Sequence, residues 1–168
     1  MVIKYVGKLS LKYKIYNMIA IEDFKIKHPN KVRFIGLDLG SKRIGVSICD
    51  ERQSIATPFK TINKTNTNEL IDELKIIIEE NNIGGIIVGN PVNMDGTMGR
   101  SAQSVNDVAS NISKNIDLPV ILWDERLSTV GAFNLSSLLD VNVSKRVKTI
   151  DQNAAAFILQ GAIDFLNN

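Results

Sequence analysis

The chain has 168 residues, of which 44% are apolar and 23% are charged, and its formal net charge is +2. This length and composition favour one folded domain with a substantial core and exclude a disordered polar chain. The apolar runs are much shorter than the roughly 20 residues that cross a bilayer, so no membrane span is expected. A single Cys49 and a single His28 exclude a disulfide framework, a cysteine-rich zinc site and a Ser-His-Asp triad. Any catalysis must therefore depend on carboxylates. The absence of a secretory signal predicts a cytoplasmic location.

The charge is distributed unevenly along the chain. Residues 1–31 contain seven lysines and two acidic residues, a net charge of +5, whereas the remaining 137 residues carry 13 basic and 16 acidic side chains, a net charge of −3. We therefore expect a basic extension over 1–31, partly helical or poorly ordered and without an assigned function, followed by a main domain over 32–168. An acidic domain binds a polyanion only through local basic clusters or through metal ions that bridge carboxylates to phosphates.

The first half of the main domain predicts three strands and a helix. Strands are expected over 32–39, 43–49 and 54–62, with turns at 40–42 and near Asp50, which together make an antiparallel meander. A helix follows, for which Asn66 is the candidate N-cap and Glu69 its capping-box partner. The helix is expected to end near 81–82.

The second half predicts strands alternating with helices. Short apolar runs at 86–88 and 120–123 are typical of strands that are covered on both faces. Between them lie a glycine-rich loop over 89–99 and a helix that has Val105, Val108, Ala109 and Ile112 on one side. A helix over 128–139, a mobile loop over 140–149 and a last helix from about Asp151 complete the α/β domain. The predicted fold is a mixed five-stranded sheet, with three antiparallel strands and then parallel strands, and with helices on its faces.

Asp38 is the first candidate site residue, because a charge inside an otherwise apolar strand is costly unless a cation compensates it. The alternatives are an ion pair with Lys42 or Arg43, or a cap on the following turn. Gly36 and Gly40 leave room on the strand for a ligand or for another backbone.

Two further positions carry candidate carboxylates. Asp124 and Glu125 end a predicted strand, and because adjacent strand residues point to opposite faces, only one of them is expected to share a site with Asp38. We favour Glu125, and the alternative is a salt bridge to Arg126. Asp151 lies at a predicted helix start, where a carboxylate by itself is also typical of an N-cap.

Taken together, Asp38, Glu125 and Asp151 form the oxygen-rich ligand set that Mg²⁺ or Mn²⁺ prefers. The glycine-rich loop leads directly into a helix and offers backbone N–H groups for a phosphate, although a tight turn at 95–96 explains it almost as well. The predicted catalytic residues are Asp38, Asp124, Glu125 and Asp151. The predicted substrate-binding residues are Lys42, Arg43, Asn93, Asp95, Arg100 and Arg126.

Four motifs, GLDLGSKRIGVSICD, GNPVNMDGTMG, DERLST and IDQNAAAFILQGAID, occur in this order over nearly all of residues 33–166. They resemble the bacterial YqgF family of ribonuclease H-like proteins, described as Holliday junction resolvases and as pre-16S ribosomal RNA nucleases. The resemblance implies a ribonuclease H-like fold and places the family's acidic residues on Asp38, on the pair 124–125 and on Asp151. The chain departs from the family pattern at Asn90, where leucine is usual, and at Gly131, where glutamate is usual. The segment before Val32 has no counterpart in the pattern.

The resemblance also implies an activity. We expect hydrolysis of phosphodiester bonds by metal-activated water, with one or two Mg²⁺ or Mn²⁺ ions, in the processing of the 5′ end of 16S rRNA, with the ribosome as a candidate partner. The alternatives are a Holliday junction resolvase acting on branched DNA and a non-catalytic protein that associates with RNA or the ribosome. The sequence leaves open RNA against DNA, the cleavage position, the number of metal ions and the choice between a monomer and a homodimer.

Overall fold

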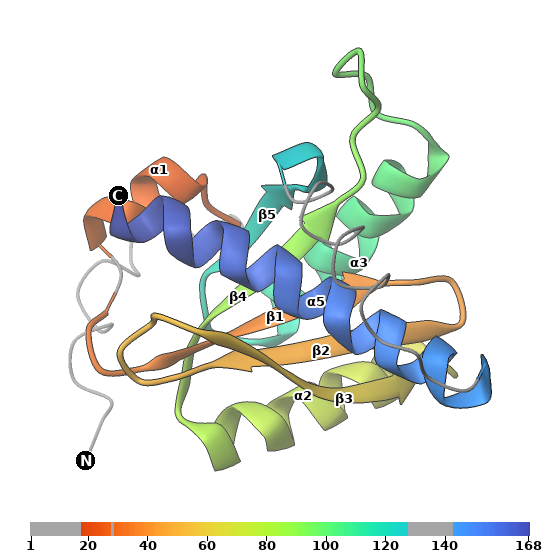
Figure 1. Ribbon diagram of the computed structural model, residues 1–168, viewed down its shortest axis with the longest axis horizontal. Helices are drawn as coiled ribbons and strands as arrows, with labels where there is room; N and C mark the ends of the chain where they lie inside the picture. Colours follow the sequence, from red (N-terminus) through yellow and green to blue (C-terminus); the bar gives the residue numbers. More distant parts are fainter. Residues whose placement is uncertain (1–17, 28, 128–142) are drawn as a thin grey trace.

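A computed structural model describes residues 18–27, 29–127 and 143–168, with the backbone alone given for residue 27 and for 143–152 (Figure 1). The helices predicted within 1–16 and over 128–139 lie outside the described residues. Five strands form one sheet in the order β3-β2-β1-β4-β5. Their bounds are β1 Arg33–Leu39, β2 Arg43–Cys49, β3 Ala56–Asn63, β4 Ile83–Asn90 and β5 Val120–Asp124.

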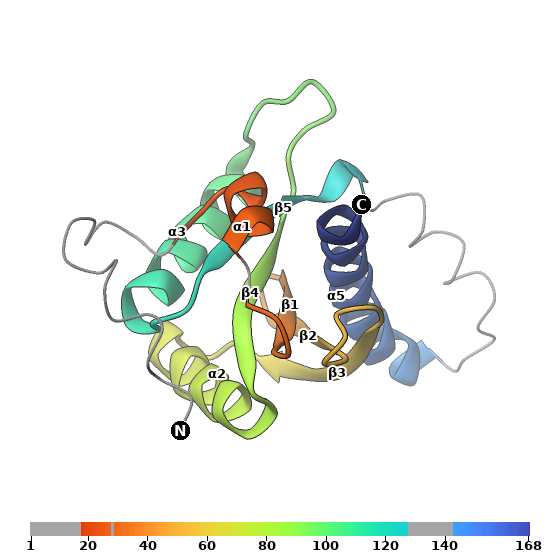
Figure 2. The same cartoon turned by 90° about the vertical axis from the view of Figure 1, so that its left-hand side faces the viewer.

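The sheet is mixed, as predicted. β1, β2 and β3 pair in an antiparallel manner, while β4 pairs in parallel with β1 and β5 pairs in parallel with β4. The described helical elements are α1 Ile21–Lys27, α2 Thr67–Asn81, α3 Arg100–Asn115, the 3₁₀ turn η1 Glu125–Leu127 and α5 Val143–Asn167. Figure 2 shows α5 against one face of the sheet and α2 and α3 against the other. The predicted α/β class with helices on both faces is confirmed.

Each face of the sheet has its own apolar core, because alternate residues of a strand point to opposite faces. In β1, Ile35 and Leu37 pack with α2 and α3, whereas Phe34 packs with α5. The apolar side of α5 is buried there as well: Ala155, Ile158, Leu159, Ala162, Ile163 and Leu166. Cys49 and Trp123 are core residues on this side of the sheet.

Local capping sets two of the element bounds. The Asn66 side chain accepts a hydrogen bond from the Glu69 N–H at 2.9 Å, so the predicted N-cap of α2 is confirmed. The Asp50 side chain accepts from the N–H groups of Ser54 and Ile55 at 2.7 and 2.8 Å. These two bonds hold the turn, and β3 therefore begins at Ala56 rather than at Ser54.

The start of α5 is the main correction to the predicted elements. The stretch 140–149 is predicted to be a loop that ends near Asp151, but α5 begins at Val143 and includes Asp151 in its interior. An N-cap role for Asp151 is therefore wrong. In the sequence of this stretch, Val143, Val147 and Ile150 have the apolar spacing that is typical of a helix, although basic residues lie between them.

Residues 18–27 pack on the domain. Met18 forms a parallel bridge with Val120 on the edge strand β5. Phe24 of α1 is buried and makes an edge-to-face contact with Phe34 at 5.3 Å between ring centroids. The Lys25 ammonium lies 5.1 Å from the ring centroid of Phe165 in α5. None of the helices that the structure describes is both long enough and apolar enough to span a membrane.

Gly36 allows α5 to approach the sheet closely. A Cβ at this position would lie 2.7 Å from Leu159 Cβ and 2.8 Å from the carbonyl oxygen of Ala155, and it would also meet Ser47 Oγ. The buried Ser47 hydroxyl donates to the same Ala155 carbonyl at 2.8 Å. Of the two predicted reasons for this glycine, the approach of another backbone is therefore the one observed.

Gly36→Ala is expected to lower the free energy of unfolding by about 1–3 kcal/mol, because the new methyl group must displace α5 from β1. Chemical denaturation of the two proteins measures the difference. Gly99→Ala is the matched control, since its Cβ would meet no atom closer than 3.5 Å, and a change within about 0.5 kcal/mol is expected. If Gly36→Ala loses no more stability than Gly99→Ala, then α5 can move away from β1 at little cost.

Candidate active site

Asp38, Gly89 and Glu125 meet where three neighbouring strands end. They lie near the carboxyl end of β1, near that of β4 and immediately after β5. Ile87 on β4 and Trp123 on β5 lie two positions before Gly89 and Glu125, and both pack with α5. Alternation therefore directs these three positions to the α5 side of the sheet. Ligand sites of α/β sheets collect at this edge.

The missing side chain of Gly89 leaves space for the Glu125 carboxylate. Glu125 Oε1 lies 2.5 Å from the place that a Cβ on Gly89 would occupy, and Ile158 of α5 closes the same space. Burial, followed by the negative charges of Asp38 and then of Asp124, raises the pKa of Glu125 to about 7. Two carboxylates are therefore held close enough to repel each other in a partly desolvated site.

A hard divalent cation fits this pair of carboxylates. Oxygen ligands with no histidine or thiolate among them suit Mg²⁺ or Mn²⁺, and a bound cation would remove the repulsion between Asp38 and Glu125. Within residues 18–27, 29–127 and the described end of α5, no group of three acidic, histidine or cysteine side chains could hold a metal ion. The third predicted ligand, Asp151, lies in α5 one turn before Ala155, and its side chain lies outside the described residues.

The Asp124 carboxylate binds Arg126. The Arg126 Nε atom lies 3.0 and 2.9 Å from the two carboxylate oxygens, and Nη2 lies 2.5 Å from Oδ2. The Arg126 side chain thereby holds the pKa of Asp124 below its usual range. The predicted alternative of a salt bridge at the strand end is thus observed for Asp124, and Glu125 is the member of the pair that lies near Asp38.

A cleft of about 420 Å³ opens beside Glu125. One wall is the start of α3, where Arg100 is the first helical residue and Gly99 supplies no side-chain cap. Glu125 and Arg126 line the cleft as well. The lining residues are Pro91, Val92, Asn93, Met94, Gly99, Arg100, Ser101, Glu125 and Arg126.

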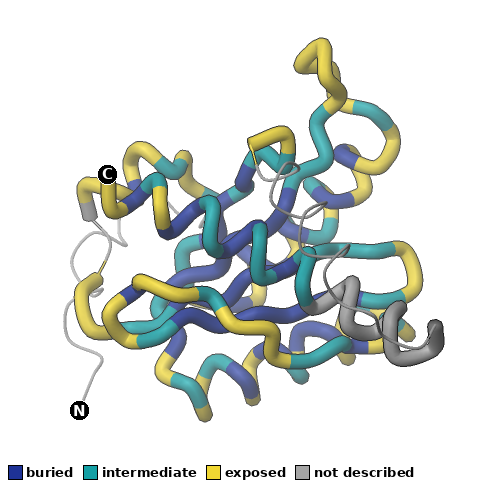
Figure 3. Tube along the Cα trace, viewed as in Figure 1, coloured by how far each residue is buried: buried dark blue, intermediate teal, exposed yellow. Residues whose placement is uncertain are grey.

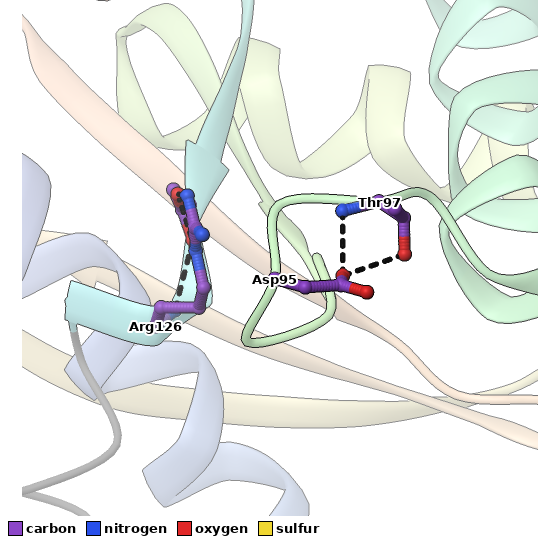
Figure 4. A network of polar contacts seen from close by, with 4 residues as sticks. Asp95, Thr97 and Arg126 are labelled. Carbon is purple, nitrogen blue, oxygen red and sulfur yellow. Dashed lines mark hydrogen bonds and ion pairs between the residues drawn. The ribbon is translucent and has the colours of Figure 1, made fainter.

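The loop between β4 and α3 is held by hydrogen bonds within itself. Asp95 Oδ1 accepts from both the N–H and the hydroxyl of Thr97, at 2.9 and 2.7 Å (Figure 4). The Asn93 side chain donates to Thr97 Oγ1 at 2.9 Å. Asn93 and Asp95, both predicted to bind substrate, therefore shape the loop. Figure 3 shows that this loop is exposed beyond the end of the sheet, and Met94 is 90% exposed.

Lys42 and Arg43 lie at the same edge of the sheet, in the hairpin between β1 and β2. Neither lines the cleft. The Lys42 carbonyl accepts from the Lys64 N–H at 2.9 Å, which closes the hairpin onto the end of β3. The predicted site residues thus divide into a carboxylate pair, a cleft that contains Arg100 and Arg126, and a basic hairpin.

Two contributors are missing from the predicted site. Gly89 makes space for Glu125, and the sequence signal for this is a glycine at the end of an apolar strand. Asn90, the next residue, has a buried Oδ1 atom that no described residue approaches as a hydrogen-bond partner. Asn90 stands where the family pattern usually has leucine. This difference marks the position, but it does not predict that the Oδ1 atom is buried without a partner among the described residues.

Comparison with known proteins shows the family of the chain. The sequence model of the family described as "RuvX: Holliday junction resolvase" matches residues 32–165. A protein of Pelagibacter ubique (strain HTCC1062), named "Putative pre-16S rRNA nuclease", is 95% identical over 151 residues, which are 90% of this chain and 100% of that protein. A protein of the same name from Sphingopyxis alaskensis is 44% identical over 145 residues, covering 86% of this chain and 95% of that protein.

Among solved structures, the one described as "T. thermophilus RuvC in complex with Holliday junction substrate" has a TM-score of 0.51 and 9% sequence identity. The match covers 76% of this chain and 91% of that chain. This likeness shows the fold, which is ribonuclease H-like as predicted. From the match over residues 32–165 and the identity to these relatives, the chain belongs to the RuvX family, also called YqgF.

Proposed function

We propose that this protein is a metal-dependent nuclease that hydrolyses phosphodiester bonds of structured nucleic acid, and that its substrate is the 5′ region of pre-16S rRNA. The observation that carries the proposal is the pair Asp38 and Glu125, two crowded carboxylates at the carboxyl edge of the sheet. A cleft that Arg100 and Arg126 line opens beside Glu125 of this pair. The name given to the relatives that are 95% and 44% identical supports the rRNA substrate.

Each group has a definite task in this proposal. Asp38 and Glu125, with Asp151, hold one or two Mg²⁺ or Mn²⁺ ions. When bound, such an ion activates water and stabilises the charge that develops on phosphate oxygens. Arg100 and Arg126 orient the phosphate groups of the substrate in the cleft, and the N–H groups at the start of α3 support them. Lys42 and Arg43 contact the backbone of the nucleic acid farther along the same edge.

Two other functions are compatible with the same fold. The family description favours a Holliday junction resolvase that acts on branched DNA. A protein that associates with RNA or the ribosome without catalysis would have no need for two carboxylates in one partly buried site. Incubating the protein with a pre-16S rRNA fragment and, separately, with a synthetic four-way DNA junction, in Mg²⁺, in Mn²⁺ and in EDTA, distinguishes the three. Cleavage of neither substrate with either metal would favour the non-catalytic function.

Asp38→Asn is expected to lower the metal-dependent cleavage rate by at least about 100-fold, because several kcal/mol of transition-state stabilisation depend on the cation that Asp38 holds. Gel assays under single-turnover conditions measure the rate. Asp117→Asn is the matched control, since Asp117 is exposed in the turn before β5 at the opposite edge of the sheet. A wild-type rate for the Asp38 variant would remove this residue from the mechanism.

Glu125→Gln is expected to stabilise the metal-free protein at pH 8. A carboxyl whose pKa rises from 4.5 to about 7 on folding binds more protons in the native state. Its contribution therefore lowers stability as the pH rises between these values, and the amide removes that loss. Denaturation in EDTA at pH 5 and at pH 8 measures the effect, with an advantage for the variant only at pH 8.

Added Mg²⁺ is expected to reduce or reverse this advantage, because the cation stabilises only a site with both carboxylates. If Glu125→Gln is no more stable than the wild type at pH 8 in EDTA, the two carboxylates are not crowded in the folded protein.

A further inference from the structure

Asp124 and Arg126 are brought together by the short turn that follows β5. The strand ends at Asp124, and η1 turns the chain so that the N–H of Arg126 donates to Asp124 Oδ1 at 3.0 Å. The same carboxylate accepts from Arg126 Nε and Nη2. Its two oxygens are therefore occupied by one residue, two positions along the chain.

The ion pair uses only one edge of the guanidinium. Arginine has five N–H donors in a planar fork, and Asp124 takes the edge formed by Nε and one N–H of Nη2. The other edge, formed by Nη1 and the second N–H of Nη2, has the geometry that binds two phosphate oxygens together. Among the described residues, Nη1 donates to no acceptor.

This second edge lies at the cleft. Arg126 lines the cleft together with Glu125 and Arg100. Its Nη1 atom lies 3.7 Å from the place that a Cβ on Gly96 would take, so it faces the tip of the loop that forms the cleft wall. In Figure 4 Arg126 lies beside this loop, while the Asp95 carboxylate is turned toward Thr97.

Stability does not account for the pair. The two side chains are 36% and 30% exposed, and ion pairs with such exposure contribute about 0–1 kcal/mol. A negative charge near the cleft should also repel a polyanion. Both points favour a role for Asp124 that acts through Arg126.

We infer that Asp124 is a positioning residue, which holds the Arg126 guanidinium so that its second edge binds a phosphate group of the nucleic acid in the cleft. The inference rests on the proposed function, because it takes nucleic acid as the ligand. It assigns the three consecutive residues 124–126 to three tasks: orienting an arginine, holding a cation and binding a phosphate.

Binding measurements test the inference without any need for cleavage. Fluorescence anisotropy in EDTA, with labelled pre-16S rRNA fragment and labelled four-way junction as probes, compares the wild type with Asp124→Asn, Arg126→Gln and the double variant. Asp124→Asn is expected to weaken binding about 5- to 10-fold, since the arginine loses its orientation, and the double variant is expected to bind no more weakly than Arg126→Gln. Arg126→Gln is also expected to reduce the slope of log affinity against log salt by about 1.

Two controls separate positioning from charge. Asp117→Asn removes the same charge at the far edge of the sheet and is expected to leave binding unchanged or slightly tighter. Arg126→Lys keeps the charge but not the fork, and it is expected to bind about as weakly as Arg126→Gln. If Asp124→Asn binds as tightly as the wild type or more tightly, or if the losses in the double variant add, the inference is overturned.

Metal titration distinguishes positioning from metal ligation. By calorimetry with Mn²⁺, Asp124→Asn is expected to keep the wild-type affinity within about 2-fold, whereas Glu125→Gln loses at least about 10-fold. An equal loss in the two variants would make Asp124 a ligand and overturn the inference. A wild-type protein that binds the probes but cleaves neither of them refutes the proposed nuclease and leaves the positioning role intact.

Discussion

The close approach of Asp38 and Glu125 is the constraint on which the site depends. Two like charges do not come together unless the backbone forces them to, and here the force is the parallel pairing of β4 with β1 and with β5. That pairing sets the ends of the three strands side by side, and Gly89 between them has no side chain to separate the carboxylates. The two apolar cores, one on each face of the sheet, stabilise the fold enough to offset this repulsion.

The position of α5 completes the constraint. The helix lies against β1, β2 and β3 at short range because Gly36 has no side chain and because the buried Ser47 hydroxyl bonds to the Ala155 carbonyl. Ile158 of the same helix closes the space around Glu125. The burial of Glu125 thus depends on how closely α5 packs against Gly36. We expect a larger residue at Gly36 to change the surroundings of Glu125 as well.

Much of this arrangement could be predicted from the sequence because its signals are local. Alternation in β1 and β5 is enough to select Glu125 over Asp124 as the neighbour of Asp38, and the Asn66 cap places the start of α2. The start of α5 could not be predicted so well, since lysine and arginine between Val143 and Ile150 are equally typical of a loop. A salt bridge to Arg126 is among the predicted alternatives, but its assignment to Asp124 depends on the 3₁₀ turn η1, which three residues of sequence do not specify. The buried Oδ1 of Asn90, which has no partner among the described residues, is a property of the folded chain that no local pattern predicts.

The family match begins at residue 32, but the apolar interior does not. The Phe24 ring fills a hollow over Phe34 and Gly85, where a Cβ on the glycine would lie 2.9 Å from Phe24 Cζ. Burying such a ring is worth about 1.5–3 kcal/mol. The first residue of the family match therefore falls inside the unit that folds together. A shortened protein that starts at Val32 would expose the apolar surface of Phe34 and Gly85 on β1 and β4.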